Sequence, residues 1–234
     1  MNLIAAYYVV LVGVFFPAVC IRALYKLKAG APFPPKPVVR KQTLIMHGLT
    51  FLLAWLTWRS FRLPLFPPYA IQWKHAAVGV AILMMFVSGA YPLWKKMAVT
   101  NRVSVYRNMP QAPNEMSLWI LMSISAGFAE EIVYRGVLFG ILMHWMHRWW
   151  TAALLCAVIF AVSHAFQGWL SVLVILVIAI VFQGLVWYTG TLYVAMVVHA
   201  VFDCISGLTY NGKWRARGDS NARPCASEAH ALSS

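Results

Sequence analysis

Long apolar segments alternate with short polar ones along almost the whole chain. A helix needs roughly 20 mostly apolar residues to cross a bilayer, and each of these segments has about that length. The predicted helices cover residues 3–25, 43–61, 70–94, 116–145, 149–166, 169–188 and 191–210. The pattern therefore predicts an all-α fold, a polytopic transmembrane helical bundle of about seven spans.

Two polar segments indicate the domain organisation. The connector 31–37 is rich in proline and cannot be helical throughout, because proline lacks the amide proton that a helix uses. The segment 212–234 is polar and rich in small residues, which is typical of chain that buries too little apolar surface to fold. We therefore predict a transmembrane domain over 1–211 and a disordered cytoplasmic tail over 212–234.

Composition and charge agree with a membrane protein and predict its orientation. Hydrophobic residues make up 62% of the chain and charged residues 11%, whereas soluble proteins average roughly 45–50% and about 25%. The net charge of +13 comes from Lys and Arg that mostly flank apolar segments, so we expect contact with lipid headgroups and no nucleic-acid partner. Fourteen of the 19 Lys and Arg residues flank one side of the membrane and four the other. The positive-inside rule predicts a multi-pass cell-membrane protein with its N-terminus outside and its C-terminus in the cytoplasm.

Acidic residues are few, and half of them fall inside predicted spans. Of the six Asp and Glu residues, Glu130, Glu131 and Asp203 lie within apolar segments. Placing a charged side chain at the centre of a bilayer costs roughly 2.5–3.5 kcal/mol on insertion scales. Because ionisable residues are rare at such depth, we expect these three to serve the function of the protein.

The two glutamates of the fourth span are predicted to differ. Glu131 and Arg135 are four residues apart, so they share a helix face, and the acid precedes the base as is favoured. Glu130 points about 100° away on a helix of 3.6 residues per turn. It then has no partner on its own helix, which favours a role as general base. The alternative is that both glutamates form a structural ion pair with Arg135.

Two further pairs with helical spacing lie on later spans. Phe160 and His164 are one turn apart on the fifth span, and His199 and Asp203 are one turn apart on the seventh. The His199–Asp203 pair could bind a metal, orient a base or stabilise an oxyanion. Each pair could instead serve only helix packing. By the predicted topology these groups and Glu130 could share one cavity that opens to the cytoplasm.

The other histidines carry no predicted chemistry. His144 and His147 flank Trp145 at the end of a span, where we expect them to face lipid headgroups. His47 and His75 are isolated within their segments, and we assign them no role.

The three motifs together resemble those of the CPBP intramembrane proteases, or Abi domain. This family includes CAAX-prenyl proteases of the Ras-converting-enzyme type and bacteriocin-processing proteins. Its motifs are EExxxR, FxxxH and a third of the form HxxxN or HxxxD. They match Glu130, Glu131 and Arg135, then Phe160 and His164, then His199 and Asp203. The resemblance covers a protease-like core of about 116–208.

The resemblance implies a role for each motif. Glu130 and His164 would activate a water molecule, and His199 with its partner would stabilise the tetrahedral oxyanion. Asp203 stands where the family often has Asn. Because an ionised Asp repels an oxyanion, Asp203 must either be protonated or act by orienting His199.

The resemblance leaves two interpretations of metal dependence. Two histidines and a carboxylate could hold zinc. The chain has no HExxH helix, however, and the ligands would come from different spans. We therefore favour glutamate-type catalysis without a cofactor, with zinc as the alternative.

The leading functional hypothesis is an intramembrane endopeptidase that cuts near the cytoplasmic face. Its expected partners are membrane lipids and a protein or peptide substrate, lipidated or with a C-terminal membrane tail. One alternative is a proton-coupled transporter that uses the same residues as a relay. Such a transporter is expected to have internal repeats, and the sequence has no detectable repeat. Another alternative is a catalytically silent immunity or scaffold protein, against which the complete set of motif residues argues.

Overall fold

The computed structural model describes residues 3–63, 65, 71–96, 109–110 and 113–218, and these are mostly helical. The first half contains α1 (Leu3–Val10), the π-helix η1 (Leu11–Phe15), α2 (Phe16–Lys28), α3 (Lys36–Phe61) and α4 (Trp73–Lys96). The second half contains η2 (Pro113–Glu115), α6 (Met116–Glu130), the π-helix η3 (Glu131–Leu138), α7 (Phe139–Met146), α8 (Trp149–Val162), η4 (Ala165–Gln167), α9 (Trp169–Thr189) and α10 (Tyr193–Gly218). The described residues include no strand, and the predicted all-α fold is confirmed.

The observed helices follow the predicted spans and differ from them at the ends. Helix α3 begins at Lys36, with Pro35 as its N-cap and Pro37 in its first turn. Proline is tolerated there because the first amide groups of a helix have no helical acceptor. Helix α10 continues to Gly218, beyond residue 211, where we predicted the transmembrane domain to end. Residues 219–234 of the predicted tail lie outside the described residues.

Several helices have the length and composition of membrane spans. Within the described residues, Leu3–Lys28, Pro113–Met146 and Trp169–Thr189 are long and apolar enough to cross a bilayer. Three shorter helices, Trp73–Gly89, Trp149–Val162 and Tyr193–Leu208, are also apolar. These helices agree with a membrane bundle, whereas the number of passes and their orientation stay predictions.

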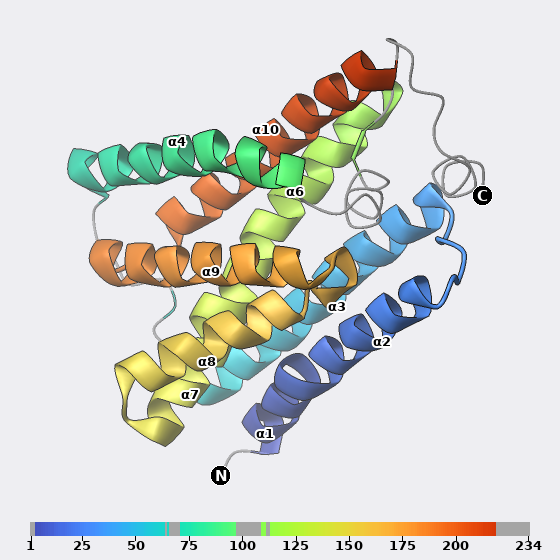
Figure 1. Cartoon of the computed structure of the whole chain (residues 1–234). Coiled ribbons are helices and arrows are strands. Elements are labelled where there is room, and N and C mark those ends of the chain that lie inside the picture. Colours follow the sequence, from blue (N-terminus) through green and yellow to red (C-terminus); the bar gives the residue numbers. More distant parts are fainter. Residues whose placement is uncertain (1–2, 64, 66–70, 97–108, 111–112, 219–234) are drawn as a thin grey trace.

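The segment formed by α6, η3 and α7 runs through the middle of the bundle (Figure 1). Helix α6 packs against α3 on one side and against α10 on the other. Helix α10 also packs on α4, and α8 packs on α9. The segment that carries both motif glutamates is therefore surrounded by helices from both halves of the chain.

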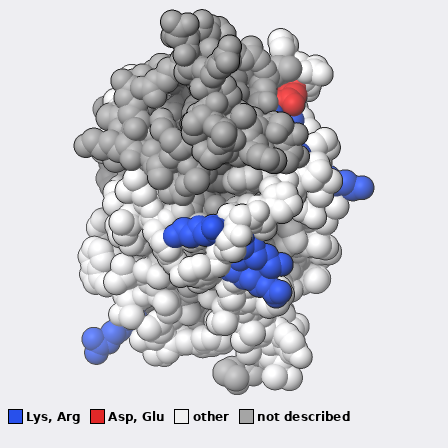
Figure 2. Space-filling view, turned by 45° about the vertical axis from the view of Figure 1, so that its right-hand side comes forward, with Lys and Arg blue, Asp and Glu red and all other residues white. Residues whose placement is uncertain are grey.

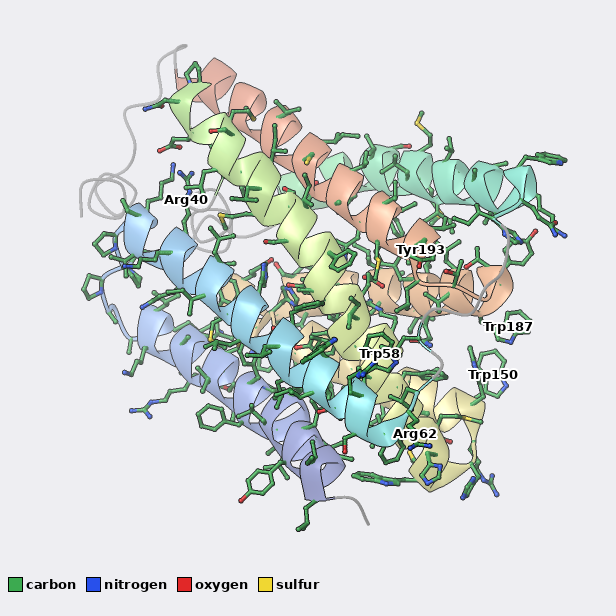
Figure 3. The ribbon with its side chains drawn as sticks, turned by 180° about the vertical axis from the view of Figure 1, so that it is seen from behind. Arg40, Trp58, Arg62, Trp150, Trp187 and Tyr193 are labelled. Carbon is green, nitrogen blue, oxygen red and sulfur yellow. The ribbon has the colours of Figure 1, made fainter. Side chains whose placement is uncertain are left out.

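The outer surface is largely apolar. Figure 2 shows a face on which few of the described side chains are charged. The ring of Trp149 lies 4.5 Å from that of Trp150 and 6.0 Å from that of Trp187. Trp150 and Trp187 are exposed and lie on the opposite side of the molecule from Arg40 in Figure 3. Exposed tryptophans of this kind are typical of a membrane–water interface.

Arg40 connects the start of α3 to the start of α6. It belongs to the basic flank that follows the first predicted span, yet it is only 5% exposed. Its Nη2 donates to Oε2 of Glu115 at 3.0 Å and to the carbonyl oxygen of Met109 at 3.2 Å. Lys36 Nζ donates to the same Glu115 oxygen at 3.1 Å. These contacts hold α3 and α6 together at one end.

The close approach of α6 and α10 depends on Gly127. A Cβ atom at this position would lie 2.7 Å from the backbone nitrogen of Ala200 and 2.8 Å from the carbonyl oxygen of Met196. Because carbon atoms cannot approach backbone so closely, only glycine permits this helix separation. Gly127 precedes Glu131 by about one turn, so the same approach brings Glu131 within hydrogen-bonding distance of α10.

We predict that Gly127→Ala destabilises the protein, because the added Cβ would push α6 away from α10. Overpacking of this kind costs typically about 1–3 kcal/mol. The midpoint of thermal unfolding in detergent should fall accordingly. Gly184→Ala is the matched control, since a Cβ there meets nothing within 4 Å, and it should not lower the midpoint. Equal midpoints for the two variants would contradict the packing argument.

Candidate active site

The site begins where the helix type changes. We predicted a regular helix through both glutamates, and this is wrong: α6 ends at Glu130 and the π-helix η3 follows. Two carbonyl groups of η3 accept hydrogen bonds from other helices. Tyr8 Oη donates to the carbonyl of Val133 at 2.8 Å, and Cys156 Sγ donates to that of Tyr134 at 3.0 Å. These bonds stabilise the wider turn, and π-helical turns are frequent at functional sites.

Glu131 lies at the centre of the site, and its side chain is 0% exposed. Its Oε1 accepts a hydrogen bond from Arg135 Nη1 at 3.0 Å and another from His199 Nδ1 at 2.8 Å. The first bond is the pair predicted from the spacing, and the second joins η3 to α10. The guanidinium of Arg135 also lies over the ring of Phe160, 4.2 Å from its centroid, in a favourable cation–π contact.

Glu130 faces histidines from two other helices. Its Oε1 lies 3.5 Å from Nε2 of His47 on α3, and its Oε2 lies 3.8 Å from Nε2 of His199 on α10. The side chain of Glu130 is 19% exposed. As predicted, these contacts of Glu130 come from other helices. Both distances are longer than a hydrogen bond, so each oxygen remains available to a water molecule.

His164 directly follows the last turn of α8. Its Nδ1 lies 2.9 Å from the carbonyl oxygen of Phe160. Because a carbonyl oxygen can only accept, Nδ1 carries the proton and Nε2 is left for another partner. The ring of Phe160 lies 4.8 Å from that of His164. Phe160 therefore touches both His164 and Arg135, which gives the second motif its packing role.

His199 and Asp203 face each other, as their spacing predicts. Nε2 of His199 lies 3.6 Å from Oδ2 of Asp203. The shorter contact of His199 is from Nδ1 to Glu131, so Nδ1 donates there and Nε2 lies near both Asp203 and Glu130. Trp119 Nε1 donates to the backbone carbonyl of Asp203 at 3.1 Å and so connects α6 to this turn of α10.

A cavity of about 580 Å³ reaches this group of side chains. Its lining includes the acids Glu130 and Asp203 and the histidines His164 and His47. Other lining residues come from α2, α3, α6 and η3, and the cavity reaches Lys26 and the proline-rich connector. His199 is 8% exposed and borders the cavity through its contacts with the two acids, outside the set of residues that line it.

Sequence reasoning missed His47. We expected it to be isolated, and this is wrong: besides Glu130 it contacts Ser125, whose Oγ lies 2.8 Å from His47 Nδ1. The contact depends on the packing of α3 on α6, which no motif records. One signal was present, because His47 is the single ionisable residue between Lys41 and Arg59.

The zinc alternative requires at least three ligands that are grouped together. Among the described residues, no three His, Cys, Asp or Glu side chains are grouped so as to hold a metal ion. His199 and His164 each bind a protein oxygen through Nδ1, that of Glu131 and Phe160 respectively, and such a partner is also usual for a histidine that binds a metal through Nε2. Catalysis without a metal therefore stays a prediction, with zinc as the alternative, and the reaction steps proposed for the site use protein side chains alone.

Comparison with known families agrees with the motif analysis. Residues 112–205 match the family model described as type II CAAX prenyl endopeptidase Rce1-like. The match covers under half of the chain and includes all three motifs, so the resemblance inferred from those motifs is confirmed. It indicates a protease of the CAAX type in a membrane protein. No curated protein and no solved structure compared with the chain matches it significantly.

We predict that Glu131→Ala destabilises the protein much more than Glu130→Ala does. The first change leaves Arg135 buried without its acid and removes the acceptor of His199. Removing one partner of a buried ion pair costs roughly 3–5 kcal/mol, whereas Glu130 is partly exposed and forms only longer contacts. Thermal unfolding of both purified variants in detergent, followed by tryptophan fluorescence, measures the difference. Similar midpoints would contradict the central role of Glu131.

Proposed function

We propose that the chain is an intramembrane endopeptidase in which Glu130, assisted by His164, activates water to hydrolyse a peptide bond. One observation carries this function: the carboxylate of Glu130 lines a cavity together with His164 and faces His199. A base, a group that orients water and a donor for the oxyanion are the groups that peptide hydrolysis needs. The Rce1-like match of residues 112–205 supports the same reaction class.

Glu130 is the general base of the proposed reaction. It takes one proton from a water molecule while the water oxygen adds to the carbonyl carbon of the peptide bond. His164 assists because its Nδ1 is bound to the carbonyl of Phe160, which leaves Nε2 for the same water. Both side chains line the same cavity, and the proposed position of the water is between them.

His199 stabilises the negative charge that develops on the peptide oxygen. Its Nδ1 donates to Glu131, so Nε2 is the atom that donates to the oxyanion. Asp203, at 3.6 Å from that nitrogen, balances the charge of the imidazolium rather than contacting the oxyanion itself. When the C–N bond breaks, the proton taken by Glu130 passes to the leaving nitrogen.

The proposed substrate is a peptide with an apolar or prenylated segment near its C-terminus. The cavity wall between α2 and α3 is largely apolar, and Lys26 and the connector border the other end of the cavity. The topology predicted from the basic residues assigns this end to the cytoplasmic side. We therefore propose cleavage near the cytoplasmic face, which agrees with the apolar lining of the cavity and with the distribution of basic residues along the chain.

We predict that Glu130→Gln abolishes cleavage and leaves the protein folded. The amide cannot accept the proton from water, and loss of a general base typically lowers the rate about 10²–10⁴-fold. The assay uses the purified full chain in proteoliposomes with a farnesylated peptide that ends in a CAAX sequence. An unprenylated peptide of the same sequence is tested in parallel, and mass spectrometry identifies the products.

The unfolding midpoint of Glu130→Gln should stay close to that of the unchanged protein. Near-full activity of this variant would show that Glu130 is not the base. If the unchanged protein cleaved neither peptide, the proposed substrate class and reaction would be wrong.

We also predict that cleavage does not depend on a metal. The described residues offer no three-ligand group for one, so treatment with EDTA or 1,10-phenanthroline should leave the rate unchanged. The same peptide assay measures this. Loss of activity that zinc restores would contradict the prediction and favour the zinc alternative.

A further inference from the structure

We propose that His47 is a positioning residue for Glu130: it stores the proton that Glu130 takes from water and, once it carries this proton, holds one carboxylate oxygen. This role rests on the proposed function of Glu130 as the base. His47 lies on α3, outside the matched segment 112–205 and outside all three motifs. It lines the same cavity as Glu130, and its side chain is 14% exposed.

Ser125 determines which ring nitrogen of His47 carries a proton. Nδ1 of His47 lies 2.8 Å from Ser125 Oγ, and this Oγ lies 2.9 Å from the carbonyl oxygen of Met122. A hydroxyl has one proton and a carbonyl oxygen can only accept, so Ser125 donates to Met122. Ser125 must then accept from Nδ1–H of His47. The unprotonated Nε2 is therefore the atom that faces Glu130.

In the resting state, no proton lies between Nε2 of His47 and Oε1 of Glu130. Nε2 lies 3.5 Å from Oε1 of Glu130, which is longer than a hydrogen bond. A lone pair on Nε2 and a carboxylate oxygen repel each other, whereas one added proton turns the pair into a charge-assisted hydrogen bond. Deprotonation of water by Glu130 delivers a proton to this pair.

Peptide hydrolysis needs a group that holds a proton between the attack of water and the departure of the leaving nitrogen. One O–H bond of water breaks as the water oxygen bonds to the peptide carbonyl carbon, and the proton goes to Glu130. It is then shared with Nε2 of His47. As the C–N bond breaks, the proton returns through Glu130 to the leaving nitrogen. The protein ends each cycle with the protons it had at the start, and no other reactant is consumed.

The other charged groups around Glu130 are less suited to this storage. His199 faces Oε2 of Glu130 at 3.8 Å, but Asp203 lies nearer to the same nitrogen, at 3.6 Å, and Glu131 holds Nδ1. His164 shares the cavity and is assigned to the water. Arg135 is bound to Glu131 and has a permanent charge. Asp203 lines the same cavity as His47, but the ion-pair contact of His47 among the described residues is with Glu130.

The first test compares His47→Gln with His144→Gln in the farnesyl-peptide assay. Glutamine can form hydrogen bonds at position 47 but cannot take up a proton. We expect kcat to fall roughly 10- to 100-fold with KM within about twofold. The pH profile of kcat should lose one ionisation, and the unfolding midpoint should not change. His144 is exposed on α7, so its variant should behave like the unchanged protein.

The outcomes separate this inference from the proposed function. If Glu130→Gln is inactive but His47→Gln keeps the kcat and pH profile of the unchanged protein, the role of His47 is refuted and the function stands. If the unchanged protein cleaves neither peptide, the function itself fails, and the role of His47 as a store for catalysis fails with it.

A second test needs no activity. The nitrogen resonances of ¹⁵N-histidine-labelled protein in detergent report the tautomer of each ring, and the His47 signals are those missing from His47→Gln. We expect the Nδ1–H tautomer in the unchanged protein and a shift towards Nε2–H in Ser125→Ala, which removes the acceptor. An Nε2–H tautomer in the unchanged protein would overturn the proposal.

Discussion

The hydrogen bonds accepted by Oε1 of Glu131 are the interaction on which the rest of the structure depends. This side chain is 0% exposed, and it accepts from Arg135 at 3.0 Å and from His199 at 2.8 Å. A carboxylate so deeply buried is tolerated only when it is paired and hydrogen-bonded. The charge of Glu131 therefore keeps η3 and α10 together, and the absence of a side chain at Gly127 lets the two backbones come close enough.

The same interaction gives two adjacent glutamates different environments. Glu131 accepts a hydrogen bond from the permanently charged Arg135 and is buried in the bundle. Glu130 lines a cavity and lies near imidazoles from α3 and α10. The structural role and the proposed chemical role are thus divided between neighbouring residues. The division follows from the direction of each side chain on the helix, since both residues carry the same carboxyl group.

Sequence reasoning succeeds where the answer depends on spacing along one helix. The apolar blocks predict the helices to within a few residues at most ends, and four-residue spacing predicts both Glu131–Arg135 and His199–Asp203. It fails where the answer depends on how helices pack. The bond between His199 and Glu131 joins residues 68 positions apart, and the approach of His47 to Glu130 requires the register of α3 on α6. The π-helix η3 was missed because a 3.6-residue period was assumed throughout.

The charges of the site explain why its histidines matter as much as its acids. Three carboxylates, those of Glu130, Glu131 and Asp203, share one permanent cation, Arg135, in surroundings where an unbalanced charge is costly. The nearby imidazoles can supply the missing positive charge by binding protons, and they can release these protons again, which Arg135 cannot do. Arginine in their place would fix the number of protons in the cluster, because its guanidinium is always charged. Hydrolysis of a peptide bond moves one proton from water to the leaving nitrogen. A site away from bulk water therefore needs side chains that can bind one proton and release it again.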